Sequence, residues 1–188
     1  VSSPEAVANM GAAVLARFGD IDVLVNAAGI NVPRRSFETL SIDDWHRVFA
    51  TNLHGAYYCV QEFLPRMRER QNGTIINISS VAGRKTFPNH VAYVGTKFAV
   101  HGLSENLREE LSPHNVRVIT IAPGAVETEL LSHTTDDVIK DGYQAWKQDM
   151  GGTVLSAEDV AAAISYAYQQ PQNVCIREIV LAATRQQA

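Results

Sequence analysis

The stretch Thr74-Ile-Ile-Asn-Ile-Ser-Ser80 decides the fold class. It is a short run rich in β-branched residues, apolar at neighbouring as well as alternate positions, and it ends in two small hydroxyl residues. Such a run is typical of a strand that is buried on both faces, as in parallel sheets covered by helices on either side. The sequence therefore predicts a central strand over residues 74–78, with Ser79 and Ser80 just past its carboxyl end.

Alternating helices and strands surround this run. Further strands are predicted over residues 21–25, 116–121 and 174–181. Helices are predicted over residues 4–18, 42–70, 90–111 and 157–168. This order predicts an α/β fold, a doubly wound parallel sheet of the Rossmann-like type, in a single domain over residues 1–188. Ligands bind such sheets at the carboxyl ends of the strands.

The composition narrows the function classes only slightly. The formal charge of −4 over 188 residues has no block of like charges behind it, so we expect neither nucleic acid nor a membrane surface as partner. The sequence has no apolar run long enough to span a bilayer and no signal-peptide pattern, so a cytoplasmic protein is expected. Cys59 and Cys175 are predicted to be reduced, partly buried thiols. No close-spaced ligand pattern predicts a metal site.

Tyr93 and Lys97 are the first candidates for chemistry. They lie four residues apart on a predicted helix, so their side chains share one face. A nearby ammonium group stabilises a phenolate and lowers its pKa toward the range that suits general acid-base catalysis. A pair with this spacing also arises by chance, so the motif depends on its surroundings.

Two further polar residues supply those surroundings. Ser80 stands at the end of the predicted strand, where its hydroxyl could hold a substrate oxygen, although serine is also common in turns. Asn52 interrupts an otherwise apolar helix, and a buried amide needs hydrogen-bond partners. A structural role for Asn52 is the alternative to a catalytic one.

Taken together, these residues resemble the short-chain dehydrogenase/reductase family. The ordered matches are Asn26-Ala27-Ala28-Gly29 to its NAG-type motif, Thr51-Asn52 to its helix asparagine, Asn77-Ile78-Ser79-Ser80 to its serine motif, Tyr93-Val-Gly-Thr-Lys97 to YxxxK, and Pro123-Gly124 followed by Thr128 to its PG-x-x-x-T segment. The matches run along nearly the whole chain in the family's order.

The resemblance implies an NAD(P)-dependent oxidoreductase that interconverts an alcohol and a carbonyl group. Ser80 would hold the carbonyl oxygen, and Tyr93 would act as the general acid or base. Lys97 would lower the tyrosine pKa and bind the nicotinamide ribose, and Asn52 would hold a water in a proton relay. The cofactor-binding set that the resemblance implies is Asn26, Ala27, Ala28, Gly29, Tyr93, Lys97, Pro123, Gly124, Val126 and Thr128.

The ends of the chain carry two further expectations. Family members begin with a strand, a glycine-rich turn and a helix that receive the pyrophosphate, so the resemblance implies that roughly 50 to 60 residues are absent from the N-terminus. We therefore expect this chain to be part of a longer protein. If that unit were truly missing, a catalytically silent subunit or scaffold is the alternative function. The tail, Ile176-Arg-Glu-Ile179 with Thr184-Arg185-Gln186, resembles an NADP-preferring branch, with NAD as the other possibility.

Substrate and subunit contacts are predicted from two regions. The loop 84–90 and the segment 129–150 are expected beside the catalytic end, with His90, Tyr143 and Trp146 as candidate contacts to a small alcohol or carbonyl substrate. The helices that carry Asn52 and Tyr93 resemble those that pair between subunits, which implies a homodimer or homotetramer. The residues assigned either to that face or to the core are Val91, Val94, Phe98 and His101.

Overall fold

A parallel four-stranded sheet organises the protein in the computed structural model, which describes residues 1–128, 130 and 137–186. The strands are β1 (Val23–Asn26), β2 (Gly73–Ile78), β3 (Val116–Pro123) and β4 (Glu178–Leu181), and they lie side by side in chain order. Every neighbouring pair is parallel, which confirms the predicted doubly wound, Rossmann-like class.

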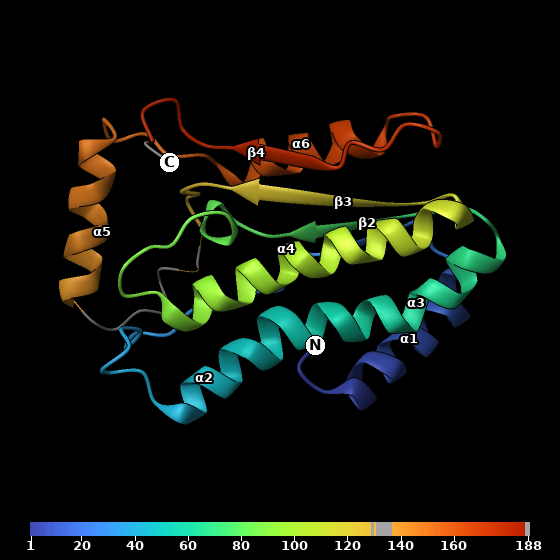
Figure 1. The fold of residues 1–188 in the computed structure, drawn as a ribbon, viewed down its shortest axis with the longest axis horizontal. Coiled ribbons are helices and arrows are strands. Elements are labelled where there is room, and N and C mark those ends of the chain that lie inside the picture. Colours follow the sequence, from blue (N-terminus) through green and yellow to red (C-terminus); the bar gives the residue numbers. More distant parts are fainter. Residues whose placement is uncertain (129, 131–136, 187–188) are drawn as a thin grey trace.

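Helices cover both faces of this sheet, as the apolar strands require. The helices are α1 (Pro4–Phe18), α2 (Ile42–Phe49), α3 (Gly55–Glu69), α4 (Val91–Leu111), α5 (Asp137–Asp149) and α6 (Ala157–Tyr168). On one face α3 and α4 pack on Ile75 and Val118, while on the other α6 packs on Ile76 and Ile119. Helix α1 lies against α3, and α5 stands beyond the carboxyl ends of the strands (Figure 1). The strand ends therefore open toward α5.

The helix predicted over residues 42–70 is interrupted. A π-helical turn, η1 (Ala50–His54), separates α2 from α3. Its hydrogen bonds reach one residue further along the chain than those of an α-helix, so it changes the face on which the following side chains project. The turn contains Asn52, which is the only buried residue within it.

Strand β4 is shorter than the strand predicted over residues 174–181. The guanidinium group of Arg117, which is buried, donates to the carbonyl oxygens of Tyr168 at 3.0 Å, Gln170 at 2.8 Å and Val174 at 3.3 Å. The backbone at Val174 is thus bonded to a side chain in place of a strand neighbour. Arg117 also satisfies carbonyl groups at the C-terminal end of α6, so it ties that helix to β3.

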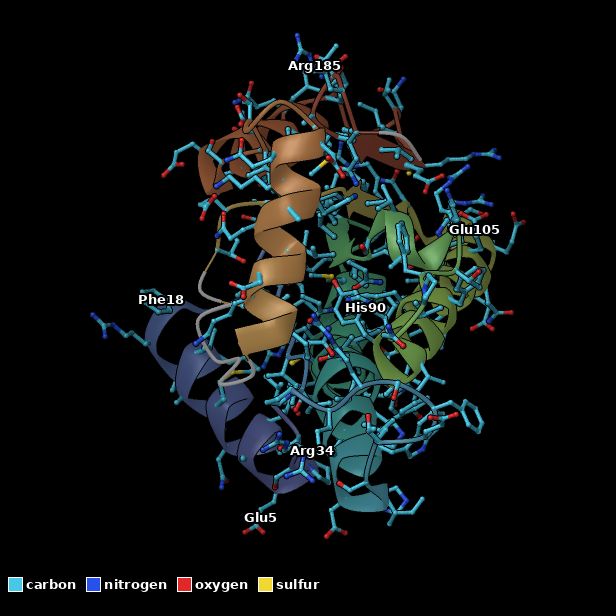
Figure 2. The ribbon with its side chains drawn as sticks, turned by 90° about the vertical axis from the view of Figure 1, so that its left-hand side faces the viewer. Glu5, Phe18, Arg34, His90, Glu105 and Arg185 are labelled. Carbon is cyan, nitrogen blue, oxygen red and sulfur yellow. The ribbon has the colours of Figure 1, made fainter. Side chains whose placement is uncertain are left out.

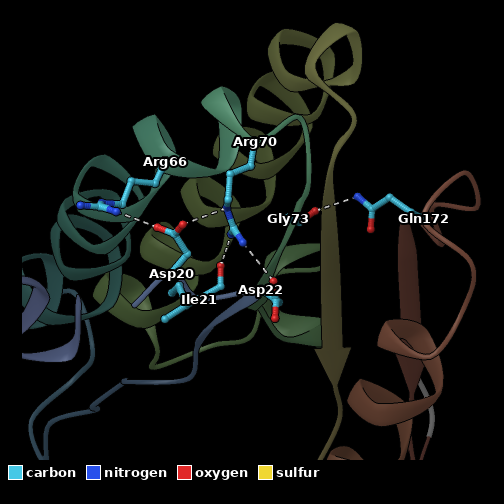
Figure 3. A network of polar contacts seen from close by, with 7 residues as sticks. All are labelled: Asp20, Ile21, Asp22, Arg66, Arg70, Gly73 and Gln172. Carbon is cyan, nitrogen blue, oxygen red and sulfur yellow. Dashed lines mark hydrogen bonds and ion pairs between the residues drawn. The ribbon is translucent and has the colours of Figure 1, made fainter. Parts of the chain in front are cut away.

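A cluster of charges fastens the opposite, amino end of the sheet. Arg66 donates to Asp20 at 2.8 Å, and Arg70 donates to Asp22 at 3.2 Å and to the carbonyl oxygen of Ile21 at 2.5 Å (Figure 3). Arg66 lies in the last turn of α3 and Arg70 is its C-terminal cap, and their partners precede β1. These contacts fix the entry of the chain into the sheet at the end away from the predicted site.

Both cysteines are free, but only one of them is enclosed. Cys59 is buried in α3, whereas Cys175 is exposed, so the prediction of a partly buried thiol is wrong for Cys175. Cys175 lies in the segment that leads into the edge strand β4, although its Sγ atom still donates to the carbonyl oxygen of Val118 at 3.5 Å. Within the described residues, no helix is long and apolar enough to cross a bilayer, and no three acids, histidines or cysteines gather in a metal-binding group.

Candidate active site

A cavity of about 410 Å³ opens at the carboxyl ends of the strands. Its lining comes from the loops after β1, β2 and β3 and from one face of α4: Ala27, Gly29, Ile30, Ile78, Ser79, Ser80, Tyr93, Lys97, Pro123, Gly124, Val126, Thr128 and Leu130. Figure 2 looks at the molecule from this end, with α5 standing in front. The volume is ordinary for a site that binds a small molecule or part of a cofactor.

Ser80, Tyr93 and Lys97 meet in this cavity. Tyr93 lies on the first turn of α4 and is hydrogen-bonded to Ser80. The Nζ atom of Lys97 lies 5.5 Å from the centre of the Tyr93 ring and donates to the carbonyl oxygen of Ile78 at 2.8 Å. The helical spacing of four residues thus places the ammonium beside the phenol, as predicted.

Burial controls the proton affinity of this pair. Burial raises the pKa of Tyr93, and the hydrogen bond with Ser80 acts in the opposite direction but is the smaller effect. The direction is opposite to the lowering that was expected from Lys97, because a buried phenolate loses its hydration. Burial also lowers the pKa of Lys97 from its ordinary 10.5 to about 8. The lysine is therefore close to its titration range at physiological pH.

Ser80 is oriented by the turn that follows it. The Oγ atom of Ser80 accepts from the main-chain nitrogen of Ala82 at 3.1 Å and lies 3.4 Å from the carbonyl oxygen of Pro123. The short helix η2 (Val81–Gly83) packs so closely on α4 that a Cβ atom at Gly83 would lie 2.7 Å from the carbonyl oxygen of Lys97. Only glycine permits this approach, which sets the serine turn directly against the helix that carries the tyrosine and lysine.

Asn52 holds the loop after β1. Its Oδ1 accepts from the main-chain nitrogen of Ile30 at 2.8 Å, and its Nδ2 donates to the carbonyl oxygen of Ile30 at 2.9 Å and to Thr96 at 3.3 Å. Thr96 in turn donates to the carbonyl oxygen of Tyr93 at 2.8 Å. Gly29 lies next to this network: an added Cβ atom there would be in ordinary contact with Oδ1 of Asn52 at 3.7 Å and with Lys97 Nζ at 3.9 Å. The amide of Asn52 is thus engaged by the loop and by α4.

The structure separates the predicted cofactor residues into two groups. Those that line the main cavity are Ala27, Gly29, Tyr93, Lys97, Pro123, Gly124, Val126 and Thr128. Asn26 and Ala28, together with the predicted catalytic residue Asn52, instead line a second cavity of about 20 Å³ on the α3 side, large enough for one water molecule. Residues 26–29 lie at the end of β1 and just after it, and successive side chains of an extended chain point to opposite faces. This alternation explains why neighbouring residues line different cavities.

The predicted substrate contacts lie around the mouth of the cavity and not in its lining. His90 directly precedes α4, and Figure 2 shows it on the open face next to α5. Its Nδ1 atom lies 2.8 Å from the carbonyl oxygen of Pro88, and burial lowers its pKa. Tyr143 and Trp146 lie on α5 with ring centres 5.7 Å apart. Most of the segment 129–136 falls outside the described residues.

Two contributors to the site were not singled out from the sequence. Thr96 is fully buried between Asn52 and Tyr93, and a polar residue three positions after the tyrosine on its helix was the available signal. Asn77, also fully buried, accepts from the side chain of Asn26 at 2.8 Å and donates to Ser104 at 2.9 Å. An amide inside an apolar strand was its signal, since a buried amide requires partners.

Comparison with known proteins agrees with this architecture. A family model described as short chain dehydrogenase matches residues 1–139. An uncharacterized oxidoreductase of Staphylococcus saprophyticus is 36% identical over 172 residues, which are 90% of this chain and 68% of that protein. The chain belongs to the short-chain dehydrogenase family of oxidoreductases.

Solved structures extend the likeness to the fold. Serine dehydrogenase from Escherichia coli matches with a TM-score of 0.82 and 31% identity, over 100% of this chain and 75% of that one. A closed form of serine dehydrogenase complexed with NADP+ matches with a TM-score of 0.89 and 32% identity over the same shares. An alcohol dehydrogenase from Thermococcus sibiricus, complexed with 5-hydroxy-NADP, matches with a TM-score of 0.83 and 26% identity, over 100% of this chain and 73% of that one.

Proposed function

We propose that the protein is an NADP-dependent oxidoreductase that interconverts an alcohol and a carbonyl group, with Tyr93 as general acid and base. The observation that carries the proposal is the position of the Tyr93 phenol in the strand-end cavity, between the hydroxyl of Ser80 and the ammonium of Lys97. A hydroxyl donor, a proton donor and a cation around one point suit a reaction in which negative charge develops on an oxygen.

In the reducing direction Ser80 donates a hydrogen bond to the carbonyl oxygen of the substrate, and Tyr93 gives that oxygen its proton. The nicotinamide supplies the hydride when it is bound. The charge of Lys97 stabilises the phenolate that remains on Tyr93, and its Nζ atom would hold the ribose of a bound nicotinamide cofactor. In the oxidising direction Tyr93 accepts the proton of the alcohol.

The residues present fit the nicotinamide half of a dinucleotide. Gly29 lines the cavity without a side chain, so a flat ring and its ribose can approach the backbone there, and Gly124 lines the cavity after β3. Thr128 and Val126 supply a hydroxyl and an apolar surface on the β3 side. The preference for NADP over NAD is supported by solved neighbours that are complexed with NADP or an NADP derivative.

Asn52 is assigned a different role from the one that the family resemblance implied. Because its amide is engaged by Ile30 and Thr96, it acts on the site by holding Gly29 beside Lys97. The resemblance had it hold a relay water between Lys97 and solvent. In the present proposal that water, if bound, occupies the small cavity that Asn52 lines with Asn26.

We also propose a homodimer or homotetramer in the cytoplasm. Tyr57 on α3 and Phe98 on α4 are 46% and 43% exposed, and such aromatic side chains are typical of interfaces. Of the four residues assigned to a subunit face or the core, none is fully buried: Val91, Val94, Phe98 and His101. The two free thiols suit a reducing compartment. Light scattering on the purified protein measures the oligomeric state.

The test combines cofactor binding with turnover in the full-length protein. We expect fluorescence titration to show binding of NADPH more tightly than NADH, and turnover on a panel of hydroxy acids, aldehydes and ketones. Tyr93→Phe should lower kcat about 10²- to 10⁴-fold and leave NADPH binding intact, because it removes only the proton donor. Tyr166→Phe, at a tyrosine 60% exposed on α6, is the matched control and should be unchanged.

Two outcomes would contradict the proposal. Full activity in Tyr93→Phe would rule out the acid-base role of this phenol. Absence of binding to either cofactor would favour the catalytically silent subunit, since the chemistry has no other source of hydride.

A further inference from the structure

The last described residues of the chain return to the loop that follows β3. The main-chain nitrogen of Gly124 donates to the carbonyl oxygen of Leu181 at 2.7 Å, where β4 ends. Five residues later, the side-chain Oε1 of Gln186 accepts from the main-chain nitrogen of Ala125 at 2.8 Å. A turn in which Gln186 donates its main-chain N–H to Ala183 at 2.8 Å brings the side chain back over the loop.

The amide of Gln186 occupies the space beside Gly124. A Cβ atom at Gly124 would lie 2.2 Å from Oε1 and 2.9 Å from Nε2 of Gln186. Gly124 also lines the main cavity, so the glycine has the glutamine amide against it and the cavity nearby. The Gln186 amide can therefore lie here only because residue 124 has no side chain.

The same loop is held by a second anchor. Leu155 donates to the carbonyl oxygen of Ala125 at 3.0 Å and accepts from the main-chain nitrogen of Glu127 at 2.8 Å. With the bonds to Leu181 and Gln186, the backbone between Gly124 and Glu127 is held at Gly124, Ala125 and Glu127. Of these partners only Gln186 contributes through its side chain, so it is the one that mutation can remove without rebuilding the backbone.

We infer that Gln186 is a positioning residue for cofactor binding, acting through the loop Pro123–Thr128. This inference rests on the proposed function. Without Oε1, the buried N–H of Ala125 lacks its acceptor, and Val126 and Thr128 spend part of the time away from their positions in the cavity lining. A site populated only part of the time binds its ligand more weakly by that fraction.

The effect should fall on affinity more than on the chemical step. Ser80 follows β2 and Tyr93 lies on α4, and Gln186 contacts neither residue in the described hydrogen bonds; Ser80 meets the loop only at the carbonyl oxygen of Pro123, at 3.4 Å, before the anchored Ala125. Saturating cofactor restores the bound arrangement of the loop by mass action. We therefore expect Gln186→Ala to raise the Kd and the KM for NADPH about tenfold, with kcat within threefold of wild type.

Two variants separate this role from general destabilisation. Gln186→Glu keeps an oxygen acceptor at the same reach and should restore affinity to within threefold of wild type. Gln172→Ala is the matched control. At the amino end of the sheet, Gln172 donates to the carbonyl oxygen of Gly73 at 3.1 Å (Figure 3) and to that of Asn115 at 2.7 Å. It removes a glutamine of the same kind and should leave the affinity for NADPH unchanged.

A double-mutant cycle with Gly124→Ala tests the contact itself. Gly124→Ala alone should displace the glutamine amide and weaken NADPH binding. In the Gln186→Ala background the space is already vacant, so the second substitution should add little. Losses that simply multiply, or a Gln186→Ala variant with wild-type affinity, would overturn the inference.

Hydrogen exchange distinguishes a failure of this inference from a failure of the proposed function. Without cofactor, the peptide that contains Ala125 should exchange faster in Gln186→Ala than in wild type, and equal rates would refute the anchoring of the loop. If wild type binds no NADPH, the proposed function and the cofactor role of Gln186 are both wrong. Faster exchange of the Ala125 peptide in Gln186→Ala would then support only the anchoring of the loop by Gln186. Wild-type binding with an unaltered variant sinks the inference alone.

Discussion

Lys97 couples the stability of this protein to pH in a direction that is unusual for a lysine. Its ammonium is almost fully buried, and burial lowers its pKa from 10.5 to about 8. Replacement by methionine keeps the length and the apolar character of the stem and removes the titrating group. The difference in unfolding free energy between wild type and Lys97→Met therefore isolates the titration of this one side chain.

The size and sign follow from proton linkage. Between pH 8 and pH 10.5 the unfolded chain binds more protons at this site than the folded protein, so the stability of wild type rises with pH across that window. Each pKa unit corresponds to about 1.4 kcal/mol. Wild type should gain about 2 to 3 kcal/mol relative to Lys97→Met between pH 7 and pH 10. The lost hydrogen bond to Ile78 adds an offset that does not change with pH.

Urea unfolding at pH 7, 8, 9 and 10 measures this difference. Lys85→Met is the matched control, since it removes a lysine from the exposed loop after η2. The difference in unfolding free energy between wild type and Lys97→Met could instead stay constant within about 0.5 kcal/mol from pH 7 to pH 10. That result would show that the ammonium is not dehydrated in the folded state. Lys97→Met should also lack turnover, because it removes the charge that stabilises the Tyr93 phenolate.

Two other substitutions probe the framework. Arg117→Met should lower the free energy of unfolding by about 3 kcal/mol, because it removes a buried guanidinium group that donates to carbonyl oxygens at the end of α6 and just after it. Arg177→Met, at an exposed position, should cost less than about 0.5 kcal/mol, and equal urea midpoints for the two variants would contradict the capping role. Gly83→Ala should abolish turnover and destabilise the fold, since its Cβ would press on the backbone of Lys97. Gly102→Ala, in α4, has open space around its Cβ and should stabilise the protein by up to about 1 kcal/mol. Wild-type kinetics in Gly83→Ala would show that the turn carrying Ser80 can move away from α4.

The sequence was informative wherever one local pattern sufficed. The apolar runs that contain Ile75 and Val118 predicted the parallel sheet, because a strand covered on both faces has no polar side. The spacing of Tyr93 and Lys97 predicted their proximity because a helix fixes it. The position of Ser80 followed from the end of a strand.

Contacts between distant segments were beyond these patterns. Arg117 was assigned to a strand, but nothing local indicates that its guanidinium reaches the carbonyl groups of α6. Gln186 is one of two adjacent glutamines at the tail, and its contact with Ala125 spans 61 positions. The pKa of Tyr93 also depends on the surroundings of the phenol, which oppose the effect that Lys97 alone would have.

The π-helical turn at Ala50–His54 amounts to one residue more than a continuous helix needs. Deleting a single residue there would let one unbroken α-helix form with the flanking segments facing nearly as before, because the wider turn absorbs the extra residue; only the side chains within the turn would change direction. The amide of Asn52 would then swing away from Ile30, and the loop beside Lys97 would lose its hold. Helix formation gains nothing from the extra residue, so selection for activity, rather than selection for stability, is what would preserve the length of this segment.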